Sequence, residues 1–428
     1  MSTTTLLPRN FIQFLCYFFC GIIVYFLFSN ETPNQLNPVN ILLQLISLII
    51  IWISFESIKK SGLKLHNWFF LVFSFFLLLN TYHISNLQRE KEFVDLYYLL
   101  IGPIVFGCFL YLGESVKISG INFNLPIKLN PNIISLLLMV IYIYILWQIY
   151  TIAGFRFFSD TLLRYQDKSE FTVPGMSGAL AIIKWILLMM IPYVTKSLRY
   201  AIVISLILFS GVMQFNRGDI FRISIFLALF YMINREKKLI TKKNLIILFT
   251  VTALGITSFA WIGEFRQSDE LNTFDIGYLM ESRVDNIAFN WLYSYSAINF
   301  DVLKLVTEAE DQNFPYTVFS LFIYYFGDRE FIEGLEKDRA SFSLSGLNAS
   351  TFLSPFVQDM GAYYIIELIV FGALMSLFII FIKAQRLTGV YLFIMLLITL
   401  TISGNYLIVP NFVVAILLAT FLGMLIKV

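Results

Sequence analysis

Long runs of apolar residues alternate with short polar segments along the whole chain, and this pattern sets the expected architecture. A helix needs roughly 20 apolar residues to cross the hydrocarbon core of a bilayer, with a range of about 17–25. Twelve runs come close to that length, the seventh, eighth and twelfth being short. They cover residues 11–28, 39–58, 67–84, 94–113, 133–152, 176–195, 200–215, 220–234, 245–262, 363–382, 390–408 and 412–427. The pattern predicts an all-α polytopic membrane protein with about 12 transmembrane helices.

The composition agrees with this reading and excludes several classes of protein. Of the 428 residues, 58% are hydrophobic and 14% are charged, whereas a soluble domain is about 45–50% apolar and about a quarter charged. A net charge of +2 gives no bulk positive field for nucleic acid. Three cysteines in apolar runs and two histidines support neither a disulfide framework nor a histidine-rich metal site. We expect no metal and no cofactor.

The basic residues of the loops predict the orientation. Segment 235–243 carries five Lys and Arg residues and is therefore expected in the cytoplasm. Counting outward from it places both termini inside, with the run at 11–28 as a retained helix, since it has no small-x-small cleavage site. The chain then divides into spans one to nine (1–262), a large loop on the periplasmic side (263–362) and the last three spans (363–428). Phe314 to Phe326 is apolar but too short to span, so this loop is expected to lie on the membrane as a lid.

The two faces differ in the type of basic residue that they carry. By this topology the inner side has twelve Lys and four Arg, and the outer side has four Lys and nine Arg. Arg presents a planar fork of donors that matches phosphate and carboxylate, so this bias favours an anionic ligand outside. Simple pairing of these arginines with outer Asp and Glu is the alternative. The outer arginines are Arg89, Arg156, Arg164, Arg217, Arg222, Arg266, Arg283, Arg329 and Arg339.

The turn between the seventh and eighth spans sharpens this hypothesis. Residues 200–234 leave only 35 positions for two passes, where two full spans need roughly 40. The turn from Asn216 to Arg222 is therefore expected near the depth of a lipid phosphate, with Arg217 and Arg222 available to it. Asp219 would neutralise one of them in the alternative reading.

One charged residue, Lys184, lies midway along the sixth predicted span. A charge at that depth is costly and marks a functional or paired site. The alternative to a functional role is a structural pair with another helix, for which Glu56 and Glu367 are the candidates.

Nucleotide hydrolysis, hydride transfer and zinc proteolysis have no support in the sequence, because it lacks a Gly-rich phosphate loop, GxGxxG after a strand, HExxH and GxSxG. Any catalysis must depend on carboxylates and arginines. The base has to lie outside, near the arginines and the membrane. We rank Asp359 first, Asp285 second and Glu264 third, the alternative being that they orient arginines.

The segment Gly346–Phe352 (GLNASTF), continuing through Pro355 to Asp359-Met360-Gly361, resembles a run of the Wzy-type O-antigen polymerases, also called oligosaccharide repeat unit polymerases. Asn216-Arg217-Gly218 is similar to the Arg-Gly turn of that family, and Arg283 stands where its loop arginine is expected. Twelve spans with a large outer loop before the last three also resemble the family, so the likeness covers nearly the whole topology.

This resemblance implies a metal-independent glycosyltransferase of the GT-C-like class in the bacterial inner membrane. Such an enzyme transfers a growing glycan from its undecaprenyl pyrophosphate to a new lipid-linked repeat unit at the periplasmic face. The implied partners are the lipid-linked oligosaccharide, membrane lipids, a chain-length regulator and a flippase. The expected substrate-binding residues are Arg217, Arg222, Arg283, Arg266, Arg156, Arg164 and Asn348.

Three other functions are compatible with a polytopic chain. A flippase or another transporter usually shows repeated halves, and this sequence shows none. An O-antigen ligase would be expected to carry a histidine in the outer loop, and 263–362 has none. A membrane acyltransferase would need a histidine in a convincing acyl-transfer motif, which neither His66 nor His83 provides.

Overall fold

The computed structural model describes residues 37–116, 129–155, 158, 171–194, 197–214, 216–233, 242–267, 276–308, 316–319 and 350–426. These residues are almost entirely helical. Within them, five helices are long and apolar enough to cross a membrane: Pro38–Ser61, Phe93–Ser115, Pro131–Ala153, Met176–Tyr193 and Ser354–Ala384. Four shorter apolar helices accompany them. The prediction of a helical, membrane-embedded protein is confirmed at this level.

A helix is found at each predicted span from the second to the twelfth, and the first span, 11–28, lies outside the described residues. The helices are α2 (Pro38–Ser61), α3 (Leu65–Asn80), α4 (Phe93–Leu96), α5 (Gly102–Ser115), α6 (Pro131–Ala153), α8 (Met176–Met190), α9 (Ser197–Met213), α10 (Arg217–Ile233), α11 (Lys242–Gln267), α12 (Ile276–Leu279), α13 (Ile287–Ser294), α14 (Asn299–Thr307), α17 (Ser354–Met360), α18 (Tyr364–Ala384), α19 (Thr388–Thr399) and α20 (Pro410–Ile426). A π-helical turn, Tyr97–Ile101, joins α4 to α5.

Local sequence explains where several of these helices begin and end. Asn37 caps α2 by accepting a hydrogen bond from the amide of Val39, and Asn130 caps α6 in the same way. In both helices proline follows as the first residue, where its missing amide hydrogen costs nothing. Gly62 ends α2 with φ 82°, a conformation that glycine adopts without strain.

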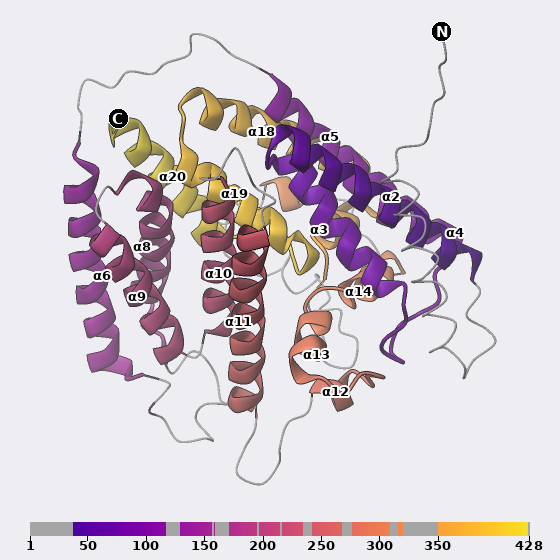
Figure 1. The fold of residues 1–428 in the computed structure, drawn as a ribbon, viewed down its shortest axis with the longest axis horizontal. Helices are drawn as coiled ribbons and strands as arrows, with labels where there is room; N and C mark the ends of the chain where they lie inside the picture. Colours follow the sequence, from indigo (N-terminus) through magenta and orange to yellow (C-terminus); the bar gives the residue numbers. More distant parts are fainter. Residues whose placement is uncertain are drawn as a thin grey trace.

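The helices form three groups in Figure 1. The first, α6, α8 and α9, stands apart from the second, which contains α2, α3 and α5, and α10, α11 and α19 lie between them. Helix α5 packs closely against both α18 and α3. A Cβ on Gly372 of α18 would meet Phe109 of α5, and a Cβ on Gly107 of α5 would meet Phe70 of α3. Small residues permit such close approach of helices in a membrane.

Segments that the predicted topology assigns to one side of the membrane meet at the same end of the structure. At the predicted inner end, Glu114 of α5 accepts a hydrogen bond from the Tyr391 hydroxyl (2.6 Å) and pairs with Lys383. At the predicted outer end, the Tyr97 hydroxyl donates to the carbonyl of Ala362 (2.8 Å). The relative order of the described helices is therefore consistent with the predicted alternation.

The eleventh predicted span, 390–408, does not form one helix. Helix α19 ends at Thr399, and 3-10 turns at Leu400–Ile402 and Tyr406–Ile408 follow it before α20 begins at Pro410. Gly404 has φ 148° at the interruption, which suits glycine. Non-helical backbone at membrane depth is tolerated where it is buried in protein or borders a cavity.

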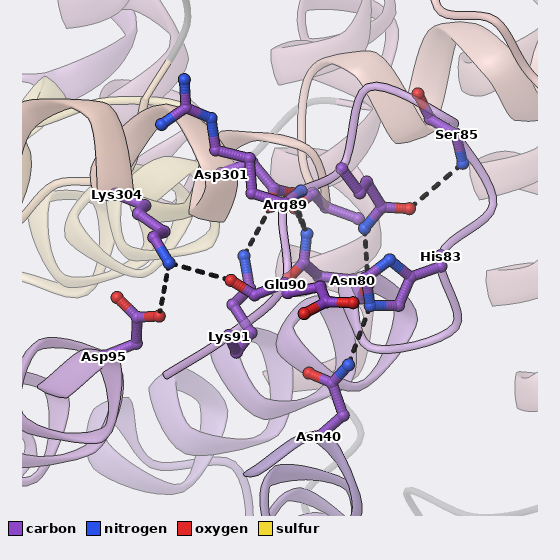
Figure 2. A network of polar contacts seen from close by, with 12 residues as sticks. Asn40, Asn80, His83, Ser85, Arg89, Glu90, Lys91, Asp95, Asp301 and Lys304 are labelled. Atoms are coloured by element: carbon purple, nitrogen blue, oxygen red, sulfur yellow. Dashed lines mark hydrogen bonds and ion pairs between the residues drawn. The ribbon is translucent and has the colours of Figure 1, made fainter. Parts of the chain in front are cut away.

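Helices α12 to α14 belong to the predicted large loop and hold the segment between α3 and α4. Lys91 pairs with Asp301 of α14 at 2.6 Å, and both side chains are buried. Figure 2 shows Asn80 and the Arg89 backbone directed at the same carboxylate, with hydrogen bonds of 2.5 and 3.1 Å. Beside them Lys304 contacts Glu92 and Asp95. The buried Asp301 carboxylate thus accepts hydrogen bonds from Lys91, Asn80 and the Arg89 amide.

Candidate functional site

A cavity of about 830 Å³ lies among the three helix groups. Residues of α3, α6, α8, α9, α10, α11 and α13 and of the interrupted segment after α19 line it. Most of its wall is apolar, including Phe75 and Phe76 of α3 and Leu229 and Met232 of α10. A cavity of this size and lining suits an amphiphile whose larger part is hydrocarbon.

The charged residues of the described wall are Lys184, Asp219 and Arg222, and together with Asn216 they form a group that we call the charge cluster. Lys184 donates to Asp219 Oδ2, and Asn216 Nδ2 donates to the same oxygen at 2.9 Å. Arg222 Nη1 donates to Asp219 Oδ1 at 3.2 Å. Asp219 is the one acidic side chain among the described lining residues. Two cations therefore face one carboxylate, which leaves the charge cluster with one positive charge in excess.

Helical periodicity brings these groups to the cavity. On α8 the lining residues Ser177, Leu180, Ala181 and Lys184 recur every three or four positions, which is one face of a helix. On α10 the spacing of Gly218, Arg222, Ile225 and Leu229 does the same. Lys184 and Asp219 are only 8% and 3% exposed, so both charges have been removed from bulk water.

Aromatic rings fix the position of the Arg222 guanidinium. Its central carbon lies 5.1 Å from the ring centroid of Tyr406 and 5.5 Å from that of Phe412. Both rings come from the interrupted segment and the start of α20. Contacts of this kind stabilise a cation and orient a planar one. The break in the eleventh predicted span therefore has a local consequence, since it places Tyr406 against Arg222.

The structure settles the partners of two residues that the sequence singled out. Lys184 pairs with Asp219, so the expectation that its structural partner would be Glu56 or Glu367 is wrong. Glu56 instead contacts Lys59 at 3.6 Å, and Glu367 accepts from the amide of Val318. Asp219 does neutralise an arginine of the turn, as the alternative reading had it, because it pairs with Arg222.

Arg283 and the three predicted carboxylates lie outside the described lining of the cavity. Arg283 and Asp285 are exposed, and Arg283 Nε donates to the side chain of Asn86 at 3.0 Å. Asp359 is fully buried and accepts from the amide of Thr317 at 2.5 Å. Glu264 accepts from the indole of Trp291 at 2.7 Å. Of the predicted site residues with described side chains, Arg222 is the one at the cavity.

The other predicted binding residues are described in part or not at all. Arg217 is the first residue of α10 and Arg266 lies near the end of α11. Arg156, Arg164 and Asn348 lie outside the described residues. Elsewhere at the predicted outer face, Arg89 pairs with Glu308 at 2.8 Å, so simple ion pairing explains that arginine.

Sequence reasoning did not place Lys184, Asn216 or Tyr406 among the binding residues. The signal for Lys184 was present, because an ionisable residue inside a spanning helix marks a site. Tyr406 carried no such signal, since it stood in a segment expected to be a continuous helix. Within the ranges that the structure describes, no group of three His, Cys, Asp and Glu side chains could hold a metal ion.

A scan against protein-family models found no match to this chain, and neither the curated proteins nor the solved structures that were searched contain one.

Proposed function

We propose that this protein polymerises lipid-linked oligosaccharide repeat units, binding the lipid pyrophosphate in the cavity beside the charge cluster. One observation carries the proposal: a large apolar cavity has two cations and one carboxylate in its wall. An amphiphile with a long hydrocarbon chain and an anionic headgroup would match both parts of this wall.

The chemistry fits a pyrophosphate held by cations. A hydroxyl oxygen of the new repeat unit forms a bond to the anomeric carbon of the growing glycan. The bond from that carbon to the pyrophosphate oxygen breaks, and the electron pair leaves with the lipid pyrophosphate. Arg222 would stabilise the charge that develops on the leaving group. The base that takes the hydroxyl proton remains a prediction, with Asp359, Asp285 and Glu264 in that order.

We propose further that the protein is a GT-C-like enzyme with twelve spans in the bacterial inner membrane. Both termini would lie in the cytoplasm, and the charge cluster would lie toward the periplasm. The lining residues support that side, because those of α8 and α9 around Lys184 lie in the halves that the Lys and Arg distribution assigns to the outside.

The lipopolysaccharide ladder of a strain that lacks this protein tests the proposal. A core carrying a single repeat unit would support a polymerase, and restoring the chain should restore the ladder. A bare core would point instead to an O-antigen ligase or a flippase. An unchanged ladder would contradict all three.

A further inference from the structure

Besides Arg222, the cavity wall contains a second cation, Lys184. Lys184 lies on the α8 face that lines the cavity and is buried against Asp219. Burying a lysine is costly, and a buried ion pair often contributes no more stability than well-packed apolar residues. Stability alone therefore gives a weak reason for this pair.

The arrangement around Asp219 leaves donors of both cations available. Asp219 is the one hydrogen-bond partner of Lys184, and likewise of Arg222, among the residues that the structure describes. A lysine ammonium has three donors and an arginine guanidinium has five. Both groups line the cavity, so their remaining donors are close to whatever occupies it.

We infer that Lys184 is a second binding residue for the anionic headgroup. Asp219 is a positioning residue, because its two carboxylate oxygens hold Lys184 and Arg222 beside the headgroup. The excess positive charge is then supplied by the pair of cations, with Asp219 preventing their mutual repulsion in the empty cavity. The inference relies on the proposed function only for taking pyrophosphate as the anion.

The Lys91–Asp301 pair provides a matched control within the same chain. It is also a buried lysine–aspartate pair, at 2.6 Å, but neither residue belongs to the described lining of the cavity. Replacing both members of a pair by neutral residues of similar shape removes both charges of that pair. In the cavity the change also removes the carboxylate that pairs with Arg222, so D219N serves as the comparison for K184M/D219N. The two double variants K184M/D219N and K91M/D301N thus differ in location and share the type of change.

The experiment measures binding of geranylgeranyl pyrophosphate to the purified full chain in detergent, with geranylgeraniol as the uncharged probe. We expect K184M/D219N to bind the pyrophosphate at least tenfold more weakly than D219N, which lacks the same carboxylate but keeps Lys184, and to bind the alcohol equally well. K91M/D301N should retain the affinity for both probes. Pyrophosphate binding by K184M/D219N within twofold of D219N would overturn the inference, as would equal affinity of the unmodified protein for the two probes.

A second variant decides the matter if K184M/D219N does not fold. Lys184→Met leaves Asp219 paired with Arg222 and Asn216, so it removes one cation without leaving the buried carboxylate unpaired. Geranylgeranyl pyrophosphate should then raise the unfolding temperature of K184M by less than that of the unmodified protein. An equal increase would contradict a role of Lys184 in binding.

The outcomes also separate this inference from the proposed function. Lysine-dependent binding of the pyrophosphate in a protein that joins no repeat units would retain the binding site and reject the polymerase. A polymerase whose pyrophosphate affinity is the same in K184M/D219N and D219N would retain the proposed function and reject the role of Lys184.

Discussion

At the scale of single residues, the role of each arginine depends on its partner. Arg222 lines the cavity, pairs with Asp219 and lies over two aromatic rings. Arg89 pairs with Glu308 where both side chains are substantially exposed. A surface pair of that kind contributes about 0–1 kcal/mol, whereas an arginine held in a cavity can recognise an anion with its planar fork.

Arg222→Lys tests whether the planar fork is needed or charge is sufficient. Lysine keeps the positive charge but loses the bidentate geometry and the stacking on Tyr406. We expect the rate of polymerisation by purified protein with lipid-linked repeat unit to fall at least about tenfold. Arg89→Lys is the control and should change the rate by less than twofold. Full activity of R222K would show that a charge alone is enough.

His83 gives a single-residue effect on stability that depends on pH. It lies beyond the end of α3, and Asn40 Nδ2 is 2.8 Å from its Nε2. Its pKa is lowered from 6.5, first by burial; nearby charges act in both directions, Lys91 and Arg283 lowering it and Asp301 and Glu90 raising it.

Because the folded pKa of His83 is lowered, the unfolded chain binds the proton more readily. Stability should therefore decrease as pH falls through about 6.5 toward the folded value. We expect the unfolding temperature in detergent to decline between pH 7.5 and 5.5, and to decline less in His83→Asn, which also suits the positive φ of this position. An identical decline in the variant would assign the effect to other groups.

At the scale of elements, the contacts between residues 81–92 and α14 connect the predicted large loop to helices α3 and α4. Figure 2 shows Lys91 and Asn80 converging on Asp301, with Lys304 facing Asp95 beside them. Helices α3 and α4 are thereby connected to a segment more than 200 positions later in the chain. Loss of one member would leave a buried charge without its partner.

Lys91→Met is expected to destabilise the protein by about 3–5 kcal/mol, because Asp301 would keep its buried charge. Glu92→Gln is the matched control, since the Glu92 side chain is 71% exposed, and it should change stability by less than about 1 kcal/mol. Unfolding in detergent, followed by circular dichroism, measures both. Equal stability of K91M and the unmodified protein would show that the buried pair does not hold this segment.

At the scale of the whole molecule, the expected alternation of helices determines on which side the charge cluster lies. The structure brings the predicted inner ends together and the predicted outer ends together. Helices α9, α10 and α11 have to alternate for Asp219 to lie at the outer end. The Lys and Arg distribution is the basis for assigning that end to the outside.

Reporter fusions test this assignment directly. A reporter fused after Lys242 is expected in the cytoplasm, and a reporter fused after Asp311 is expected on the periplasmic side. The reason is the five basic residues of 235–243, which favour the inner face. A cytoplasmic reporter at residue 311 would reverse the position of the charge cluster and contradict the proposed function.

The sequence by itself determined the helical membrane class and the position of most helices, because the length of an apolar run and its caps are local properties. It also singled out Lys184, since a charge in an apolar run stands out wherever the helix lies. Arg222 was singled out because it belongs to the turn between two short spans. It could not choose Asp219 over Glu56 or Glu367 as the partner of Lys184.

Only the tertiary structure decided that partner, and the same holds for the cavity and the Arg222 environment. Lys184 and Asp219 are 35 positions apart on different helices, and their contact depends on how α8 and α10 are rotated and tilted against each other. The interruption after Thr399 likewise brings Tyr406 to Arg222. Hydrophobic periodicity reports which residues avoid water, but it contains no information about which helix faces which, and that arrangement is what assembles the charge cluster.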